Sequence, residues 1–412
     1  MKSKESILPL LPLLLFLLIT EVRLGPGQLQ KAAPTSVITA NLFLYGSIYL
    51  LAMGLFVYHK QRQGRVHLWH MSFPLLLMLG YLPVGFLWTV SPVDLLKEIV
   101  HFAGVLLIAI VVQFTIQGNN QRFYKTLFLF SLLMALSSLF VSLFIPNFGI
   151  GVKGRWQGVT GNPNHLGIIS LLGVYSVTVL MARVGLRKCC WWFYLAALFL
   201  YFFCLVMADS VSSLVLSIMT VCLIPLVVMT IRSRKVSQAI FQLSLIYVAI
   251  MAGIFLVYLV KPESVGLDTF FSSAGRSRTL TGRTELWISG WRLFLERPLL
   301  GWGFDNLATL SQQSGGKIGY GQFHNGYIDL LVRGGCAGSI VFLIFCGWLL
   351  VAFFRALRKH AESAMCLVLL VFIIYLHNMT ESSFLEFPNV FWLLTVTVYF
   401  QLWSLARYRN VR

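Results

Sequence analysis

The sequence predicts an all-α membrane protein that crosses the bilayer about twelve times. Its residues are 58% hydrophobic and only 11% charged, and its mean hydropathy is +0.80. The chain therefore has too few polar residues to cover the surface of a water-soluble protein. Apolar runs of about 20 residues, enough to span a hydrocarbon core of about 30 Å, recur along the chain. The long polar interruption lies at 261–333. We therefore expect a polytopic helical bundle with one large loop, carrying short amphipathic helices, before the last spans.

The expected spans are all apolar runs bounded by polar or turn-forming residues. They lie near 6–20, 37–58, 68–90, 97–116, 125–145, 165–183, 191–208, 211–231, 238–260, 334–354, 364–380 and 388–405. The first is short enough for the core of a signal peptide, but no clean small-residue cleavage site follows it, so we expect a retained helix. The chain then divides into nine spans in 1–260, the loop 261–333 and three spans in 334–412.

Basic residues set the expected orientation, because short cytoplasmic loops collect Lys and Arg. An inside N-terminus places the following residues in inner segments: Lys2, Lys4, Lys60, Arg62, Arg65, Arg122, Lys125, Arg183, Arg187, Lys188, Arg232, Arg234, Lys235, Arg355, Arg358, Lys359, Arg407, Arg409 and Arg412. The net charge of +18 mostly reflects this bias. A nucleic-acid partner is therefore not expected.

The outer loop carries cations that break this bias. They are Lys261, Arg276, Arg278, Arg283, Arg292, Arg297, Lys317 and Arg333. For Arg292, Arg297 and Lys317, pairing with acidic residues of the loop is the simpler interpretation. The denser group of Arg276, Arg278 and Arg283 has only Glu285 close by, and guanidinium groups match phosphate oxygens. We expect these three to bind phosphate or pyrophosphate.

The loop also predicts a surface helix and a candidate acid or base. From Thr284 the apolar residues recur with helical spacing until Pro298 ends the run, as in a helix lying at the membrane surface. His324 stands just before the next span. It is either an interfacial side chain without a role or, beside the arginine group, a general acid or base.

A second outer turn, 146–163, is rich in glycine and proline. It displays Lys153 and Arg155, and Asn162 and Asn164 follow where the sixth span begins. An ordinary glycine-rich connection is the alternative, but outer cations are otherwise scarce, which favours a binding role for this turn. Asp209, at the outer end of the seventh span, either faces the cavity as a functional carboxylate or is solvated in the interface.

Several of these segments resemble the O-antigen ligase family, which includes O-antigen-type polymerases. The similar segments are GRTELW, ERPLLGWGFDN, the HN motif of His324 and Asn325 with DLLVRGG after it, and an R-x-x-G-x-x-x-N-P-N pattern from Arg155 to Asn164. They cover about a quarter of the chain. One departure is ADSVSS at 208–213, where family members often show Ser-Arg.

The resemblance implies transfer of a glycan from undecaprenyl pyrophosphate to an acceptor hydroxyl at the periplasmic face of a bacterial inner membrane. Arg155 and Arg283 would hold the pyrophosphate, and His324 would activate the acceptor, with inversion at the sugar. Without an outer DxD or ExD pair, no metal is expected, and no cofactor is expected either. The acceptor would be lipid A-core in a ligase or a growing glycan in a polymerase.

An anion transporter is the alternative from another class of function. Twelve helices with outer cations can form a path for an anion. Transporters usually carry charged residues within their spans or repeat their halves, and the sequence shows no internal repeat. The large polar loop on one side and the family motifs favour the transferase, and of its two branches the ligase.

Overall fold

The computed structural model describes residues 10–22, 35–63, 69–89, 91–116, 119–151, 154–184, 188–232, 279–304, 323–385 and 388–407. Within these ranges the chain is helical, and its one extended pairing is an isolated bridge between Ile150 and Trp156. The helices are α1 (Leu11–Glu21), α2 (Thr35–Gln63), α3 (Trp69–Tyr81), η3 (Leu82–Leu87), α4 (Pro92–Ile116), α5 (Asn120–Phe144), α6 (Pro146–Gly149), η5 (Gly158–Thr160), α7 (Pro163–Val184), α8 (Lys188–Met207), α9 (Val211–Arg232), α12 (Thr279–Glu296), α14 (Gly326–Leu357), α15 (Ala361–His377) and α16 (Val390–Arg407).

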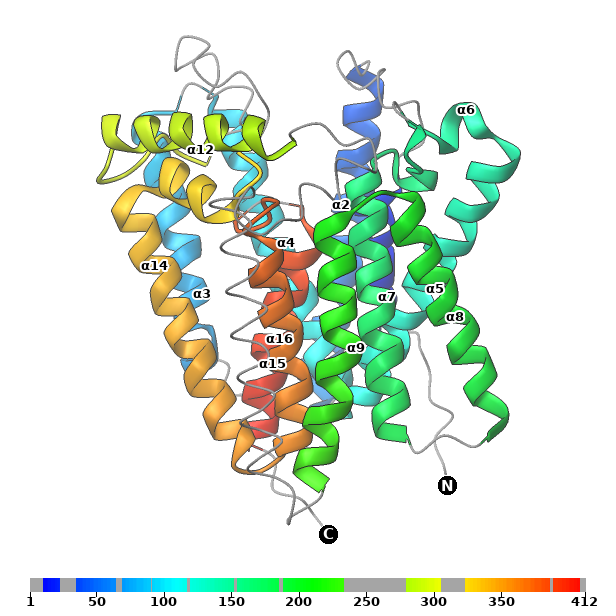
Figure 1. Ribbon diagram of the computed structural model, residues 1–412. Coiled ribbons are helices and arrows are strands. Elements are labelled where there is room, and N and C mark those ends of the chain that lie inside the picture. Colours follow the sequence, from blue (N-terminus) through cyan, green and yellow to red (C-terminus); the bar gives the residue numbers. More distant parts are fainter. Residues whose placement is uncertain are drawn as a thin grey trace.

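The long helices form one bundle, and α12 lies across one end of it (Figure 1). We call this the α12 end. At the opposite end, helices finish with basic residues, among them Arg183 of α7, Arg232 of α9 and Arg407 of α16. Arg183 and Arg232 both bind the carboxylate of Glu362 there, at 2.9 and 3.1 Å. We call this the basic end.

The helix lengths confirm an all-α fold suited to a membrane. In the described residues, six helices are long and apolar enough to cross a bilayer, and they lie in α4, α5, α7, α9, α14 and α16. At about 1.5 Å per residue, the 25 residues of α4 cover about 37 Å, more than the hydrocarbon thickness. Every predicted span overlaps a helix within the described residues, except 238–260, which lies outside them. The number of crossings stays a prediction.

Two helices, α7 and α16, form the centre of the bundle. Residues 171–180 of α7 and 390–405 of α16 are buried throughout. Helix α7 packs against α5, α8 and α9, whereas α16 packs against α4, α14 and α15. Close approach depends on glycine, because the ring of Tyr201 lies where Gly173 would carry a side chain. Small residues allow such backbone approach in membrane helix packing.

The helix predicted from Thr284 is confirmed as α12, which begins earlier, at Thr279, and ends at Glu296. Its position at the membrane surface stays a prediction. The segment after it is bound to a kink in α14, where Gly335 has a φ of 59°. The amides of Trp302 and Gly303 donate to the carbonyls of residues 332 and 333, and the amides of residues 336 and 337 donate to those of 298 and 299, all at 2.8 to 2.9 Å. The Tyr81 hydroxyl donates to Gly334 O at 2.7 Å. We call this set of bonds the kink latch.

Replacing Gly335 with alanine is expected to destabilise the protein. An added Cβ would lie 2.5 Å from the Gly301 nitrogen and 2.6 Å from the Leu299 carbonyl oxygen, and the φ of 59° is strained for any L side chain. Such backbone strain costs about 1–3 kcal/mol before the clash is added. Gly347→Ala, in the same helix with nothing within 4 Å, is the matched control. Thermal melting in detergent checks this, and equal midpoints for both variants would contradict it.

Candidate functional site

The carboxylate of Glu381 gathers three parts of the chain at the α12 end. Its Oε1 accepts from Asn164 Nδ2 at 2.8 Å and from Arg283 Nη2 at 3.2 Å, and its Oε2 lies 2.9 Å from His324 Nδ1. These partners are 217, 98 and 57 residues away in sequence. The Glu381 side chain is only 13% exposed, so its charge depends on these partners rather than on water.

Arg155 joins this group through Asn164. Its Nη2 donates to Asn164 Oδ1 at 3.0 Å and to the Asp209 carbonyl at 3.1 Å, and its Nε donates to the Ala208 carbonyl at 3.0 Å. Main-chain carbonyls orient a guanidinium without neutralising it, so Arg155 keeps its charge. Nη1 has no hydrogen-bond partner among the described residues and stays available as a donor.

The turn that carries Arg155 is fixed by backbone contacts. The amide of Trp156 donates to the Met207 carbonyl at 2.9 Å, which ties the turn to the end of α8. Gly158, with a φ of 53°, lies against Ser138 of α5 with no space for a side chain. The turn therefore presents Arg155 from a defined backbone between α5, α7 and α8.

The two arginines at this site oppose each other electrostatically. Burial lowers the pKa of Arg155 from its ordinary value, and the neighbouring charge of Arg283 lowers it further, against the raising effect of Glu381. Arginine stays protonated even so. The two guanidiniums and the one carboxylate by themselves carry a net charge of +1, so an incoming anion would relieve the repulsion between the arginines.

His324 is held by its backbone as well as by Glu381. Its φ is 49°, an uncommon conformation for a residue other than glycine. The next residue, Asn325, caps α14 by accepting from the amides of residues 327 and 328 at 3.0 and 3.2 Å. Gly326 then donates to the Asn378 carbonyl at 2.8 Å. These contacts join the start of α14 to the turn that contains Glu381.

Helix α12 positions Arg283 against the same segment. Trp287 Nε1 donates to the Phe323 carbonyl at 3.1 Å, and Gly290 lies where an added Cβ would be 2.5 Å from Ile328 Cγ2. A small core fills the space beneath the helix and contains Leu293, Phe294, Trp302, Phe323 and Val332. Arg283 Nη1 donates to the Thr380 carbonyl at 2.8 Å. The helix is thus fixed to the segment just before His324 and to the turn that contains Glu381.

A second histidine and carboxylate pair lies at the same end. His165, next to Asn164, places Nδ1 2.8 Å from Oε2 of the buried Glu21 at the end of α1. His377 is fully packed, with Nε2 3.3 Å from Ser213 Oγ. Neither contact involves Glu381 directly. The first joins α1 to α7, and the second joins α9 to α15.

The geometry supports base chemistry at His324. When Nδ1 donates its proton to Glu381, Nε2 carries the lone pair and can accept a proton from a hydroxyl. The carboxylate also stabilises the imidazolium that forms. Among the described residues, no three His, Cys, Asp or Glu side chains are grouped as ligands for a metal ion. That the reaction proceeds without a metal stays a prediction.

The predicted site residues have different outcomes. The structure brings together Arg155, Asn164, Arg283 and His324, with Asn325 as a helix cap that also donates to the Met379 carbonyl at 3.4 Å. Lys153, Arg276 and Arg278 lie outside the described residues.

Two further predicted residues meet the site through their local structure. The Asn162 side chain accepts from the Asn164 amide at 2.8 Å and so starts α7, and Asp209 contacts Arg155 through its carbonyl. Asp209 is exposed, with a φ of 53°. Sequence reasoning missed Glu381. The signal available for it was a rare acidic residue at a predicted outer helix end, since the chain has only 14 acidic residues.

The fold and this site define a helical membrane protein with a cationic, carboxylate-organised centre at one end. Residues 196–343 match the family model described as O-Antigen ligase, which confirms the family resemblance. The chain is also similar to "Exopolysaccharide production protein ExoQ" of Rhizobium meliloti (strain 1021), with 28% identity over 218 residues. That match covers 49% of this chain and 47% of the relative, so the chain spans about half the length of the curated relative it matches.

The stabilising effect of Glu381 is expected to depend on pH. Burial raises the pKa of its carboxyl, but the hydrogen bond from His324 and the charges of His324, Arg283 and His377 outweigh burial, so the pKa lies below the ordinary value of 4.5. The carboxylate therefore contributes stability above about pH 4.5 that is lost as the pH falls through the folded-state pKa.

Thermal melting of the parent and of Glu381→Gln between pH 7 and pH 3 checks this. The difference in midpoint should be full at pH 7 and should shrink below about pH 4.5. Glu285→Gln, an exposed glutamate on α12, is the control and should show little difference at any pH. A Glu381→Gln difference that stays constant down to pH 3 would refute the assignment.

Proposed function

We propose that this protein is a glycosyltransferase that moves a glycan from a lipid pyrophosphate carrier, undecaprenyl pyrophosphate, to an acceptor hydroxyl. The observation that carries the proposal is the meeting of Arg155, Arg283 and His324 around one carboxylate. It combines an anion site with a base at the end of a membrane bundle, where a lipid carrier can present its head group. The match to the O-antigen ligase family supports the same chemistry.

Arg155 and Arg283 bind the pyrophosphate of the donor. As the bond between the sugar C1 and the pyrophosphate oxygen breaks, the electron pair stays on that oxygen and its charge grows. Guanidinium groups already oriented by carbonyls and by Glu381 stabilise this charge without reorganising. The net positive charge of the site supports such a role.

His324 activates the acceptor. Its Nε2 takes the proton of the acceptor hydroxyl while the acceptor oxygen bonds to C1 on the face opposite the leaving pyrophosphate, so the configuration at C1 inverts. Glu381 holds the Nδ1 proton and stabilises the imidazolium. Glu381 is thus a positioning residue. The charges are provided by the chain itself, and we propose that the transfer needs no metal.

The site end faces the periplasm in this proposal. The basic end carries Arg183, Arg232, Arg355 and Arg407 and fits the cytoplasmic side by the positive-inside rule. The inner membrane of a bacterium then contains the protein. We propose lipid A-core as the acceptor, in an O-antigen ligase. The similarity to an exopolysaccharide production protein favours a second candidate, a polymerase that extends a growing glycan.

A reconstituted assay tests the function. Purified protein receives an undecaprenyl-pyrophosphate-linked glycan with EDTA, in one tube with lipid A-core and in another without a further acceptor. Product on lipid A-core supports a metal-independent ligase, and longer glycans in the second tube support the polymerase. Activity that EDTA abolishes would refute metal independence, and no product in either tube, with or without EDTA, would refute the transferase and favour anion transport.

Variants of the site are expected to separate its roles in that assay. His324→Ala should lose about 10²–10⁴-fold in rate because the general base is gone. Arg283→Ala should lose about 10²–10³-fold because the leaving group is no longer stabilised. Arg292→Ala, an exposed arginine nine residues further along the same helix, should change the rate less than about twofold. Retained activity in both site variants would refute this assignment.

A further inference from the structure

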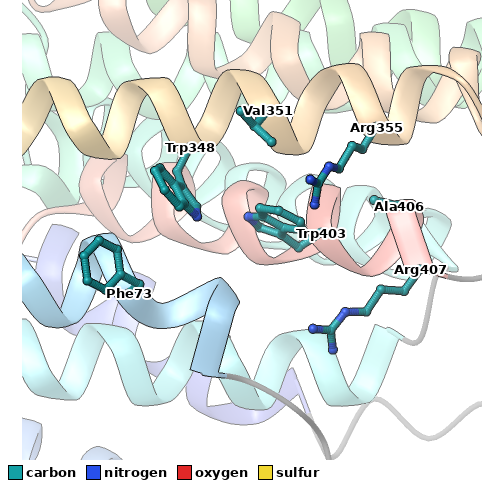
Figure 2. Close-up of a pocket in the computed structure, with 7 residues that line it drawn as sticks. All are labelled: Phe73, Trp348, Val351, Arg355, Trp403, Ala406 and Arg407. Atoms are coloured by element: carbon teal, nitrogen blue, oxygen red, sulfur yellow. The ribbon is translucent and has the colours of Figure 1, made fainter.

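A cavity at the basic end lies far along the bundle from the candidate site. It has a volume of about 590 Å³ and lies between α3, α14 and α16. Its lining consists of Phe73, Trp348, Val351, Arg355, Trp403, Ala406 and Arg407 (Figure 2). This volume falls within the range of about 300–1,000 Å³ typical of small-molecule sites. The lining contains three aromatic side chains and two arginines, and none of its seven residues is acidic.

Helical spacing arranges this lining in order. Val351 and Arg355 follow Trp348 by three and seven residues, so the three side chains share one face of α14. On α16, Trp403 and Arg407 are four residues apart and also share a face. Figure 2 shows the two arginines toward one end of the cavity and Phe73 with Trp348 toward the other. The cationic groups therefore lie at the helix ends, and Phe73 and Trp348 lie farther along the helices from those ends.

Part of the cavity wall is open to the surroundings of the bundle. Phe73 is 47% exposed, Trp348 37% and Val351 41%. In contrast Trp403 is only 7% exposed, and the Arg355 guanidinium lies 5.2 Å from the centre of its ring. Trp348 and Val351 of this wall belong to α14, which is long and apolar enough to cross a bilayer, and Phe73 belongs to the shorter apolar helix α3.

We propose that this cavity binds an anionic glycerophospholipid of the surrounding membrane. Arg355 and Arg407 bind the phosphate of the head group at the helix ends, and Phe73, Trp348 and Val351 contact the upper part of the acyl chains. The order of the lining matches the order of groups in such a lipid. Basic pockets between membrane helices on the cytoplasmic side favour anionic head groups. The site is separate from the proposed transferase centre and does not depend on its chemistry.

Lipid retention by the purified full-length protein tests the proposal. The protein in detergent is titrated with phosphatidylglycerol, and bound lipid is counted by native mass spectrometry. We expect Arg355→Gln and Arg407→Gln each to weaken retention about fivefold, the effect of one basic side chain near a lipid phosphate. Arg358→Gln is the matched control, because Arg358 is exposed at the same helix end but does not line the cavity. It should bind like the parent.

A second pair of variants tests the acyl contact. Trp348→Ala should also lower retention, whereas Trp192→Ala should not, because Trp192 is 77% exposed on α8 and lies away from the cavity. Three results would overturn the proposal. The first is retention of phosphatidylcholine equal to that of phosphatidylglycerol. The second is a loss of retention in Arg358→Gln as large as that in Arg355→Gln and Arg407→Gln. The third is full competition by inorganic phosphate, which would indicate a site for phosphate alone.

Discussion

The α12 end of this protein depends on the largely buried carboxylate of Glu381. A charge removed from water is tolerated only where partners replace its hydration, and here Asn164, Arg283 and His324 replace it. Removing one partner of such a group typically costs about 3–5 kcal/mol, because the remaining charge stays buried. Each of the three partners comes from a different part of the chain. These three parts of the chain therefore meet at the Glu381 carboxylate, which brings the groups proposed for catalysis together.

The kink latch attaches residues 279–304, which belong to the polar loop in the sequence, to the helical bundle. Backbone bonds between 298–303 and 332–337 join the end of α12 to α14, and Tyr81 joins both to α3. Gly301 and Gly335 allow the two backbones to approach because neither carries a side chain. The small core beneath α12 then fixes Arg283 relative to His324. Residues 279–304 of the polar loop therefore pack as a layer on the helices of the bundle.

The sequence predicted the spans and α12 because both depend on repeated patterns. A run of 20 apolar residues or a helical spacing of apolar side chains involves many residues, so single exceptions do not hide it. The position of α14 was less clear. Apolar content places its span at 334, but the cap at Asn325 and the kink at Gly335 let the helix begin at Gly326.

The role of Glu381 does not follow from a repeated pattern. Its rarity as an acidic residue at a helix end marks it in the sequence, but it becomes a centre only when distant segments meet around it. Arg155, Arg283 and His324 were found through their charge and family motifs, whereas their mutual contacts needed the structure. The backbone of His324 has a further consequence. At its φ of 49° glycine is the residue with least strain, so the position at which the proposed chemistry requires histidine is one where the fold would prefer another residue. Selection for stability and selection for activity therefore act in opposite directions at this single position.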